Sequence, residues 1–164
     1  DTQDHDGNDN EFKRKFLVVV DDTPEAAKAV TFAALRVRRT GGTVVLLSII
    51  EPDHHQHWLG VEEIMRSEAW NALDTLQSRQ VARIAAFGSI KVEKVIREGK
   101  KVDAVEAQIA EDPDIAILVL AAADSSDGPG PLVASIAARG ANAYGVPVTV
   151  VPGTISDSVL AALC

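Results

Sequence analysis

Short, almost unbroken apolar stretches recur along the chain, with amphipathic or small-residue stretches between them. Apolar runs occupy residues 16–20, 43–50, 115–121 and 148–151. Runs of this length are typical of strands that are covered on both faces. Residues 90–96 instead alternate between apolar and charged positions, which also predicts a strand. The pattern therefore predicts five strands.

Helical stretches separate these strands. The first is predicted to begin with Thr23 as N-cap and Pro24 in the first helical position, and to end near Arg39, before two glycines. The second covers about residues 61–86, where apolar side chains recur at spacings of three and four. The predicted apolar stripe consists of Val61, Met65, Ala69, Ala72 and Leu76. Trp70 lies off this stripe, and the sequence leaves open whether it is partly buried, covers the strand ends or contacts a partner.

Two shorter helices and a terminal one complete the pattern. Asp103 is predicted to cap a helix that runs through Ala110. After the fourth strand, a Gly-Pro-Gly-Pro loop leads into a helix that is predicted to end near Ala143, and residues 156–164 are predicted to form a loose helix. Helices that alternate with buried strands indicate one α/β domain, because right-handed crossovers place helices on both faces of a parallel sheet. The predicted fold is a three-layer α/β/α sandwich.

Ligands of such sheets bind beyond the carboxyl ends of the strands, where the strand order reverses. In this chain those ends lie at residues 21–22, 48–51 and 121–124. We therefore expect any small-molecule site to be built around these segments.

The same segments carry a family likeness. Residues 18–23, 45–50, 95–99, 118–121 and 145–151 resemble, in this order, the strands and turns of universal stress proteins. No single segment is specific, but the ordered set spans almost the whole chain. The resemblance implies a Rossmann-like fold, similar to that of the adenine nucleotide alpha hydrolases, with a mostly parallel sheet in the strand order 3-2-1-4-5.

The resemblance also implies a domain and an assembly. The family domain is expected over residues 13–152, between an acidic tail at residues 1–12 and a C-terminal extension at residues 153–164. A homodimer is expected to pair through the fifth strand, residues 148–151. The apolar edge that invites such pairing consists of Val148, Val150 and Val151.

The ATP-binding branch of this family carries the motif G-x2-G-x9-G-[ST] after the fourth strand. At the same spacing this chain has Ala121, Asp124, Ala134 and Ser135, so only the serine matches. Glycine is needed there because backbone N–H groups must approach phosphate oxygens closely, often at positive φ. A carboxylate about 4 Å from a phosphate charge costs about 4 kcal/mol at an effective dielectric constant near 20, roughly a thousandfold in affinity. We therefore expect no ATP binding in the family's usual manner.

Three further positions keep alternatives open. Gly128 and Gly130 either shape the loop or rebuild a cradle for ATP or AMP at the start of the following helix. The resemblance implies a ribose contact for Asp21, which could equally cap the next helix or be solvated at the strand end. It also implies an adenine contact for the backbone near Ile49, which leaves no signal in the side chain.

Other chemistry has little support in the sequence. His54, His55 and His57 are close enough to bind a transition metal, but no second cluster completes a site. No nucleophile elbow, Walker loop or dinucleotide fingerprint is present, and the serines near the fourth strand lack an evident base. We therefore predict no metal, no cofactor and no catalytic residue.

The net charge and the cysteine content limit which classes of partner and which compartment are expected. The 164-residue chain has a net charge of −8, half of which comes from Asp1, Asp4, Asp6 and Asp9 in a segment that is predicted to be flexible. An acidic surface is repelled by nucleic acid and anionic lipid. With the single cysteine Cys164, no bilayer-spanning apolar run and no visible signal peptide, a cytoplasmic protein is expected. The sequence predicts a non-catalytic stress-response or regulatory protein that acts on an unidentified protein partner.

Overall fold

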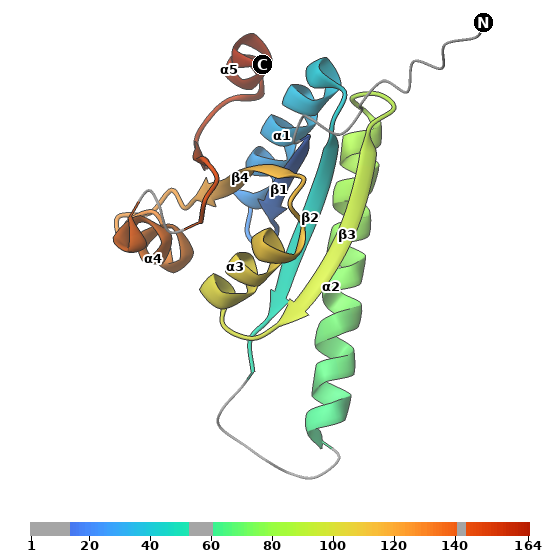
Figure 1. The fold of residues 1–164 in the computed structure, drawn as a ribbon, viewed down its shortest axis with the longest axis vertical. Coiled ribbons are helices and arrows are strands. Elements are labelled where there is room, and N and C mark those ends of the chain that lie inside the picture. The colour runs from blue at the N-terminus through green and yellow to red at the C-terminus, as the bar shows by residue number, and fades with distance from the viewer. Residues whose placement is uncertain (1–13, 53–60, 141–143) are drawn as a thin grey trace, which may run out of the picture.

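The computed structural model describes residues 14–52, 61–140 and 144–164. Within them, five strands form one parallel sheet in the order β3-β2-β1-β4-β5. The strands are β1 (Lys15–Val19), β2 (Thr43–Ile50), β3 (Lys91–Glu98), β4 (Ile115–Ala122) and β5 (Val148–Pro152). The helices are α1 (Ala26–Thr40), α2 (Val61–Ala85), α3 (Lys101–Glu111), α4 (Pro131–Arg139) and α5 (Asp157–Leu163). The predicted α/β class, the strands and their order are confirmed (Figure 1).

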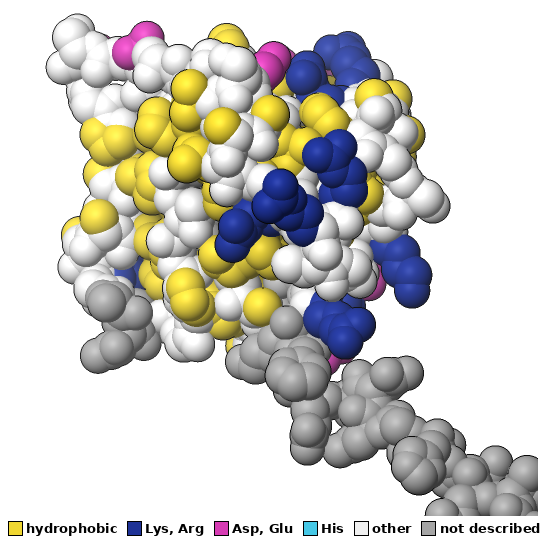
Figure 2. All heavy atoms as spheres, turned by 90° about the horizontal axis from the view of Figure 1, so that it is seen from above, with side chains coloured by type: hydrophobic (Ala, Val, Ile, Leu, Met, Phe, Trp, Pro, Cys, Tyr) yellow, Lys and Arg dark blue, Asp and Glu magenta, His cyan; other side chains and the backbone are white. Residues whose placement is uncertain are grey.

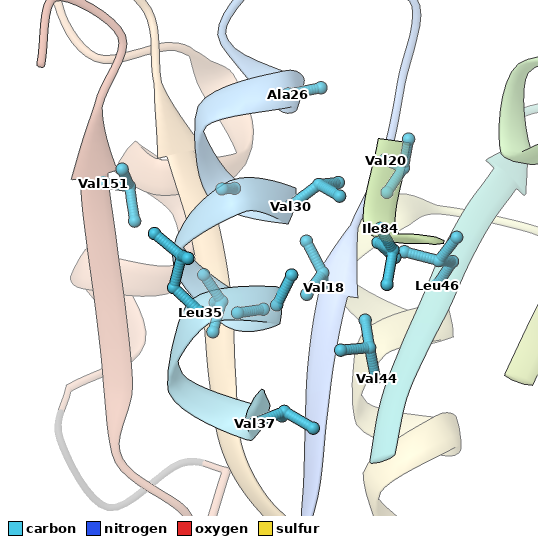
Figure 3. Packing of buried hydrophobic residues seen from close by; sticks show 14 of the residues in the cluster. Val18, Val20, Ala26, Val30, Leu35, Val37, Val44, Leu46, Ile84 and Val151 are labelled. Carbon is cyan, nitrogen blue, oxygen red and sulfur yellow. The ribbon is translucent and has the colours of Figure 1, made fainter. Parts of the chain in front are cut away.

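Helices cover both faces of the sheet, and alternate residues of the central strand face opposite layers. Val18 packs with α1 in one apolar cluster, while Leu17 and Val19 pack with α3 and α4 in the other. Ile84 of α2 and Leu160 of α5 join the cluster around α1. Figure 3 shows side chains of α1 and of the strands pointing toward one another in this layer. Burial on both faces explains why the central strands read as continuous apolar runs.

Two helices begin elsewhere than predicted. The hydroxyl of Thr23 donates a hydrogen bond to Oδ1 of Asp21 and does not cap α1, which begins at Ala26 after a turn. Such local side-chain bonds compete with helix capping. The prediction for Asp103 is also wrong, because Lys100 holds the N-cap position of α3 and Asp103 lies within the first turn. A carboxylate in a first turn is favoured by the helix dipole without capping the helix.

The apolar stripe predicted for α2 is confirmed only in part, since Leu76 packs against the core and Ala69 is partly buried. Met65 is 51% exposed and Ala72 is exposed, whereas Gln77 and Ile84 of the C-terminal half are buried. Figure 1 shows the reason, since the N-terminal half of α2 extends past the ends of the strands and has no sheet to cover. Trp70, on this extending half, is 47% exposed.

The C-terminal residues pack firmly on the domain. Leu160 is fully buried and Cys164 is 3% exposed. An ion pair of 3.0 Å joins Asp157 of α5 to Lys28 of α1. The terminal helix is therefore part of the core layer around α1 and is not loose.

Some predicted features fall outside the described residues. They are the acidic tail, the loop with its three histidines, and residues 141–143, to which the fourth helix was predicted to run. Helix α4 ends at Arg139, because Gly140 takes the C-cap position with a φ of 87°. None of the described helices combines the length and the apolar character that a bilayer span requires.

Candidate functional site

Asp21 and Ala121 meet where β1 and β4 end side by side. Both line a cavity of about 30 Å³, together with Thr23, Glu25 and Leu132. A volume of this size holds roughly one water molecule. The carboxylate of Asp21 accepts the hydrogen bond of Thr23 and does not cap α1, whose N-cap position belongs to Glu25. The space between the two predicted site residues is therefore the size of a water molecule.

Ala134 and Ser135 lie inside α4 and not at its start. The helix begins at Pro131, and the N–H of Ala134 donates to the carbonyl oxygen of Gly130 at 3.1 Å. An N–H that is bonded within a helix is not available to a phosphate, since only the first turn leaves its N–H groups free. The first turn of α4 instead brings Leu132 against the cavity beside Asp21.

The glycine-containing loop forms a hollow of its own. Gly128 and Gly130 have φ values of 100° and 103°, which disfavour residues with a Cβ. With Asp127 and Ala134 they line a hollow of about 470 Å³. The N–H of Gly128 donates to the carbonyl oxygen of Ser125 at 3.2 Å, and the two prolines of the loop have no N–H. In this Gly-Pro-Gly-Pro stretch, Gly130 alone keeps an N–H that could face an anion.

A larger cleft of about 640 Å³ opens between α3 and α4. Lys100 and Lys101 line it at the start of α3, Ser135 and Arg139 line it from α4, and Glu51 lines it beyond the end of β2. Arg139 is already bound to two carboxylates of α3. The cleft thus carries charges of both signs, and its two lysines form no ion pair with another described residue.

Six of the eight residues predicted for a nucleotide site are divided among three hollows, and the other two line none of them. Asp124 is exposed on the loop after β4, and Ile49 packs into the apolar cluster under α3 and α4. The sequence analysis missed Leu132, which closes the cavity beside Asp21. Its signal was an apolar residue directly after the last proline of the loop. The analysis also missed Lys100 and Lys101, although adjacent lysines directly follow the third strand.

Metal and thiol chemistry find little support in the part of the chain that the structure describes. There, no three His, Cys, Asp or Glu residues lie close enough together to hold a metal ion. The candidate ligands His54, His55 and His57 lie outside those residues. Burial raises the pKa of the Cys164 thiol, which disfavours the reactive thiolate.

Comparison with other sequences gives one family. A model of the universal stress protein family matches residues 13–152. Among curated proteins, no sequence matches this chain significantly.

Solved structures show the same fold. The universal stress protein UspA from Lactobacillus plantarum is 22% identical with a TM-score of 0.67, over 87% of this chain and 99% of that one. A universal stress protein in complex with cAMP is 17% identical with a TM-score of 0.63, over 84% and 96% of the two chains. The protein from Archaeoglobus fulgidus in complex with dAMP is 22% identical with a TM-score of 0.55, over 84% and 97%. At these identities the likeness establishes the fold alone.

Proposed function

Because this chain belongs to the universal stress protein family over residues 13–152, we propose that it is a non-catalytic stress-response or regulatory protein that does not bind ATP through the family's phosphate loop. The fold of the family is retained. The proposed difference lies at the carboxyl ends of β1 and β4, where the ligand of such a sheet would bind.

The observation that carries the proposal is the small cavity beside Asp21. Its volume is about 30 Å³, whereas ligand pockets measure roughly 300–1,000 Å³. Leu132 closes the cavity from the first turn of α4, and α4 is held against the sheet by the buried Ile136. Enlarging the cavity would therefore require the start of α4 to move.

The charge on the loop after β4 supports the same conclusion. Asp124 and Asp127 are both exposed there, and neither forms an ion pair with another described residue. Uncompensated carboxylates repel a triphosphate.

A non-catalytic role is supported by the sequence, which has no nucleophile elbow, Walker loop or dinucleotide fingerprint. The single cysteine is buried, and burial raises the pKa of its thiol, which disfavours a nucleophilic thiolate.

The rival function is a nucleotide sensor with a remodelled loop. The hollow beside Gly128 and Gly130, at the start of α4, is the observation in its favour. Two similar structures hold cAMP and dAMP. Against it stand the two prolines of the loop, which have no N–H, and the carboxylate of Asp127, which lines the hollow.

The two functions are separated by nucleotide content and calorimetry. The purified protein is denatured, the supernatant is analysed for released AMP or ATP, and ATP with Mg²⁺ is titrated into the native protein. We expect no released nucleotide and no measurable heat of binding. The Archaeoglobus protein, titrated with dAMP, is the positive control. Micromolar ATP binding that Gly130→Ala abolishes would establish the sensor instead.

The proposal includes an assembly, a location and a domain division. The edge strand β5 exposes Val148 by 37% and Val150 by 42%, which supports a homodimer paired through this strand. We propose a cytoplasmic protein that acts through a protein partner, since its net charge disfavours nucleic acid and anionic membranes. Residues 13–152 form the proposed domain, and residues 1–12 and 153–164 are its extensions.

A further inference from the structure

The end of the molecule at which the strands begin is positively charged, although the chain as a whole is acidic. Arginines and one lysine gather there from several elements, because parallel strands all begin at the same end of the sheet. Figure 2 looks onto this end and shows Lys and Arg side chains grouped on one part of it, with few Asp or Glu. We name this group the arginine face. It consists of Arg14, Arg36, Arg38, Arg39, Arg83 and Lys91.

Hydrogen bonds and strand register bring the elements that carry these residues together at this end. The carbonyl oxygen of Arg14 accepts the N–H of Thr43 at 3.0 Å, just beyond the end of α1. Arg38, in the last turn of α1, donates to the carbonyl oxygen of Phe87 at 3.5 Å, just beyond the end of α2. Lys91 begins β3 and lies in register with Thr43. The arginine face therefore spans α1, α2 and the first residues of the central strands.

The charges of the arginine face are not neutralised by the folded domain. None of its six members forms an ion pair with another described residue. Elsewhere Arg66 and Arg97 each hold a carboxylate. Of the carboxylates near this end, Glu93 and Asp112 bind Lys15 at 3.0 and 2.9 Å, and Asp114, directly before β4, is exposed and forms no ion pair with another described residue. Like charges brought together repel one another, so this surface favours an anionic partner.

The chain itself supplies a segment of the opposite charge. Residues 1–11 contain five carboxylates and no lysine or arginine. Only Phe12 and Lys13 separate them from Arg14, and they precede the match to the family, which begins at residue 13. We propose that the arginine face binds the acidic segment of residues 1–11 of its own chain.

Tethering and side-chain chemistry favour this occupant. The thirteen residues before Arg14 span at most roughly 45 Å when extended, which reaches every member of the face. A short tether holds the acidic segment near the arginine face at an effective concentration in the millimolar range. A free polyanion of similar affinity would have to be present at a higher concentration to displace the segment. The fork of the guanidinium group suits carboxylates, and five of the six cations are arginines. The bound segment would cover the arginine face and exclude other polyanions from it.

Paramagnetic relaxation tests this contact. A nitroxide is attached to Thr2→Cys in a Cys164→Ala background, and amide signals of the ¹⁵N-labelled full chain are recorded at low and high salt. We expect signals of residues 36–41 and 83–88 to lose intensity at low salt, while those of residues 99–103 at the opposite end keep theirs. High salt should restore the lost signals, because it screens exposed charge pairs. Loss of intensity that is uniform, absent or unchanged by salt would overturn the proposal.

Charge reversal provides the matched control. Arg36→Glu with Arg39→Glu should abolish the effect, whereas Lys100→Glu with Lys101→Glu, at the opposite end, should leave it intact. Arg36, Arg39 and Lys100 are exposed and Lys101 is half-buried, and the amide spectra report whether each variant is folded. Equal effects of the two pairs would contradict specific binding. A mixture of ¹⁵N-labelled chains with spin-labelled, unenriched chains should show no loss, and a loss there would mean binding between copies and overturn the in-chain contact.

A second measurement does not depend on substitutions in the domain. The chain that begins at Phe12 should elute from a heparin column at higher salt than the full chain, because its arginine face is uncovered. Elution of the two chains at the same salt concentration would show that residues 1–11 do not cover the face, and would overturn the proposal.

Discussion

Gln77 is a fully buried polar side chain that links α2 to two strands. Its Nε2 donates to the carbonyl oxygens of Leu46 and Val95 at 3.2 and 2.8 Å, and to Oγ of Ser48 at 3.1 Å. Ser48 in turn donates to the carbonyl oxygen of Val20 at 2.7 Å. Polar contacts thus run from the end of β1 to β3 through a region that is otherwise apolar.

Removing this link should destabilise the domain. Gln77→Ala leaves buried acceptors without their donor and opens a cavity, so we expect a loss of about 2 kcal/mol in the free energy of unfolding. Urea denaturation measures the loss. The matched control is Ser78→Ala, at an exposed position of the same helix, which should stay within about 0.5 kcal/mol of the parent. A loss no larger than that of the control would mean that Gln77 does not hold the strands.

Lys15 predicts how stability responds to alkali. Hydrogen bonds to Asp112 and then to Glu93 raise the pKa of Lys15 above its ordinary value of 10.5. A pKa that is raised in the folded state stabilises the protein below pH 10.5 and ceases to do so as the pH rises through the folded-state pKa. The free energy of unfolding should therefore fall as the pH rises above 10.5.

Lys15→Met removes this response. We expect the variant to be less stable by about 1 kcal/mol near neutral pH and to lose less stability in alkali than the parent. Urea titrations at a series of pH values measure both effects. Lys91→Met, at the exposed first position of β3, is the control, since Lys91 has no ion pair with another described residue. Identical pH profiles for the parent and Lys15→Met would contradict the assignment.

At the scale of elements, β5 is an edge strand with an apolar outer side. Val150→Lys places a charge in the proposed contact between two copies, so the variant should be a monomer. Light scattering should give about half the mass of the parent. Thr154→Lys, at an exposed position just beyond the strand, is the control and should remain a dimer. A dimeric Val150→Lys variant would place the interface elsewhere.

Strands could be predicted from the sequence more closely than helices, for a physical reason. A strand covered on both faces reads as an apolar run wherever it lies, and the predicted bounds of β2 agree with the structure. The prediction of an apolar stripe failed for the N-terminal half of α2, because the pattern of a helix does not reveal where the sheet beneath that helix ends. The predicted start of α1 was wrong because the hydroxyl of Thr23, which could have capped the helix, forms a local hydrogen bond with Asp21 instead.

The candidate site could be predicted only in part, because a motif's spacing does not fix where a helix begins. Asp21 and Ala121 line the same cavity, as expected for residues at the carboxyl ends of two adjacent parallel strands. Ala134 and Ser135 keep the family's spacing but lie within α4, because Pro131 starts the helix before them. A helix can begin earlier and shorten the loop before it, while the number of residues between the motif positions stays the same.

At the scale of the whole molecule, the two ends of the sheet differ in charge. The amino ends of the strands meet the arginine face, and the carboxyl ends carry exposed carboxylates such as Asp22, Glu51 and Asp124. Such a separation orients the molecule as it approaches a charged partner. An acidic partner should therefore meet the arginine face first only when residues 1–11 do not cover that face, and a basic partner should meet the opposite end.

The closed site at the carboxyl end should resist simple restoration. Ala121→Gly, Asp124→Gly and Ala134→Gly together recreate the family's glycines, yet Leu132 and the start of α4 at Pro131 remain. We expect the triple variant to show no ATP binding by calorimetry, because the N–H of residue 134 stays bonded to Gly130. Micromolar ATP binding by this variant would mean that the missing glycines alone prevent ATP binding in the parent chain.

The position of Pro131 also limits what a change inside α4 can achieve. Because the helix begins at Pro131, a glycine at position 134 would still lie within it, with its N–H bonded to the carbonyl oxygen of Gly130. Any gain of phosphate binding at this end of the sheet would therefore have to come from the loop before Pro131 and not from the helix.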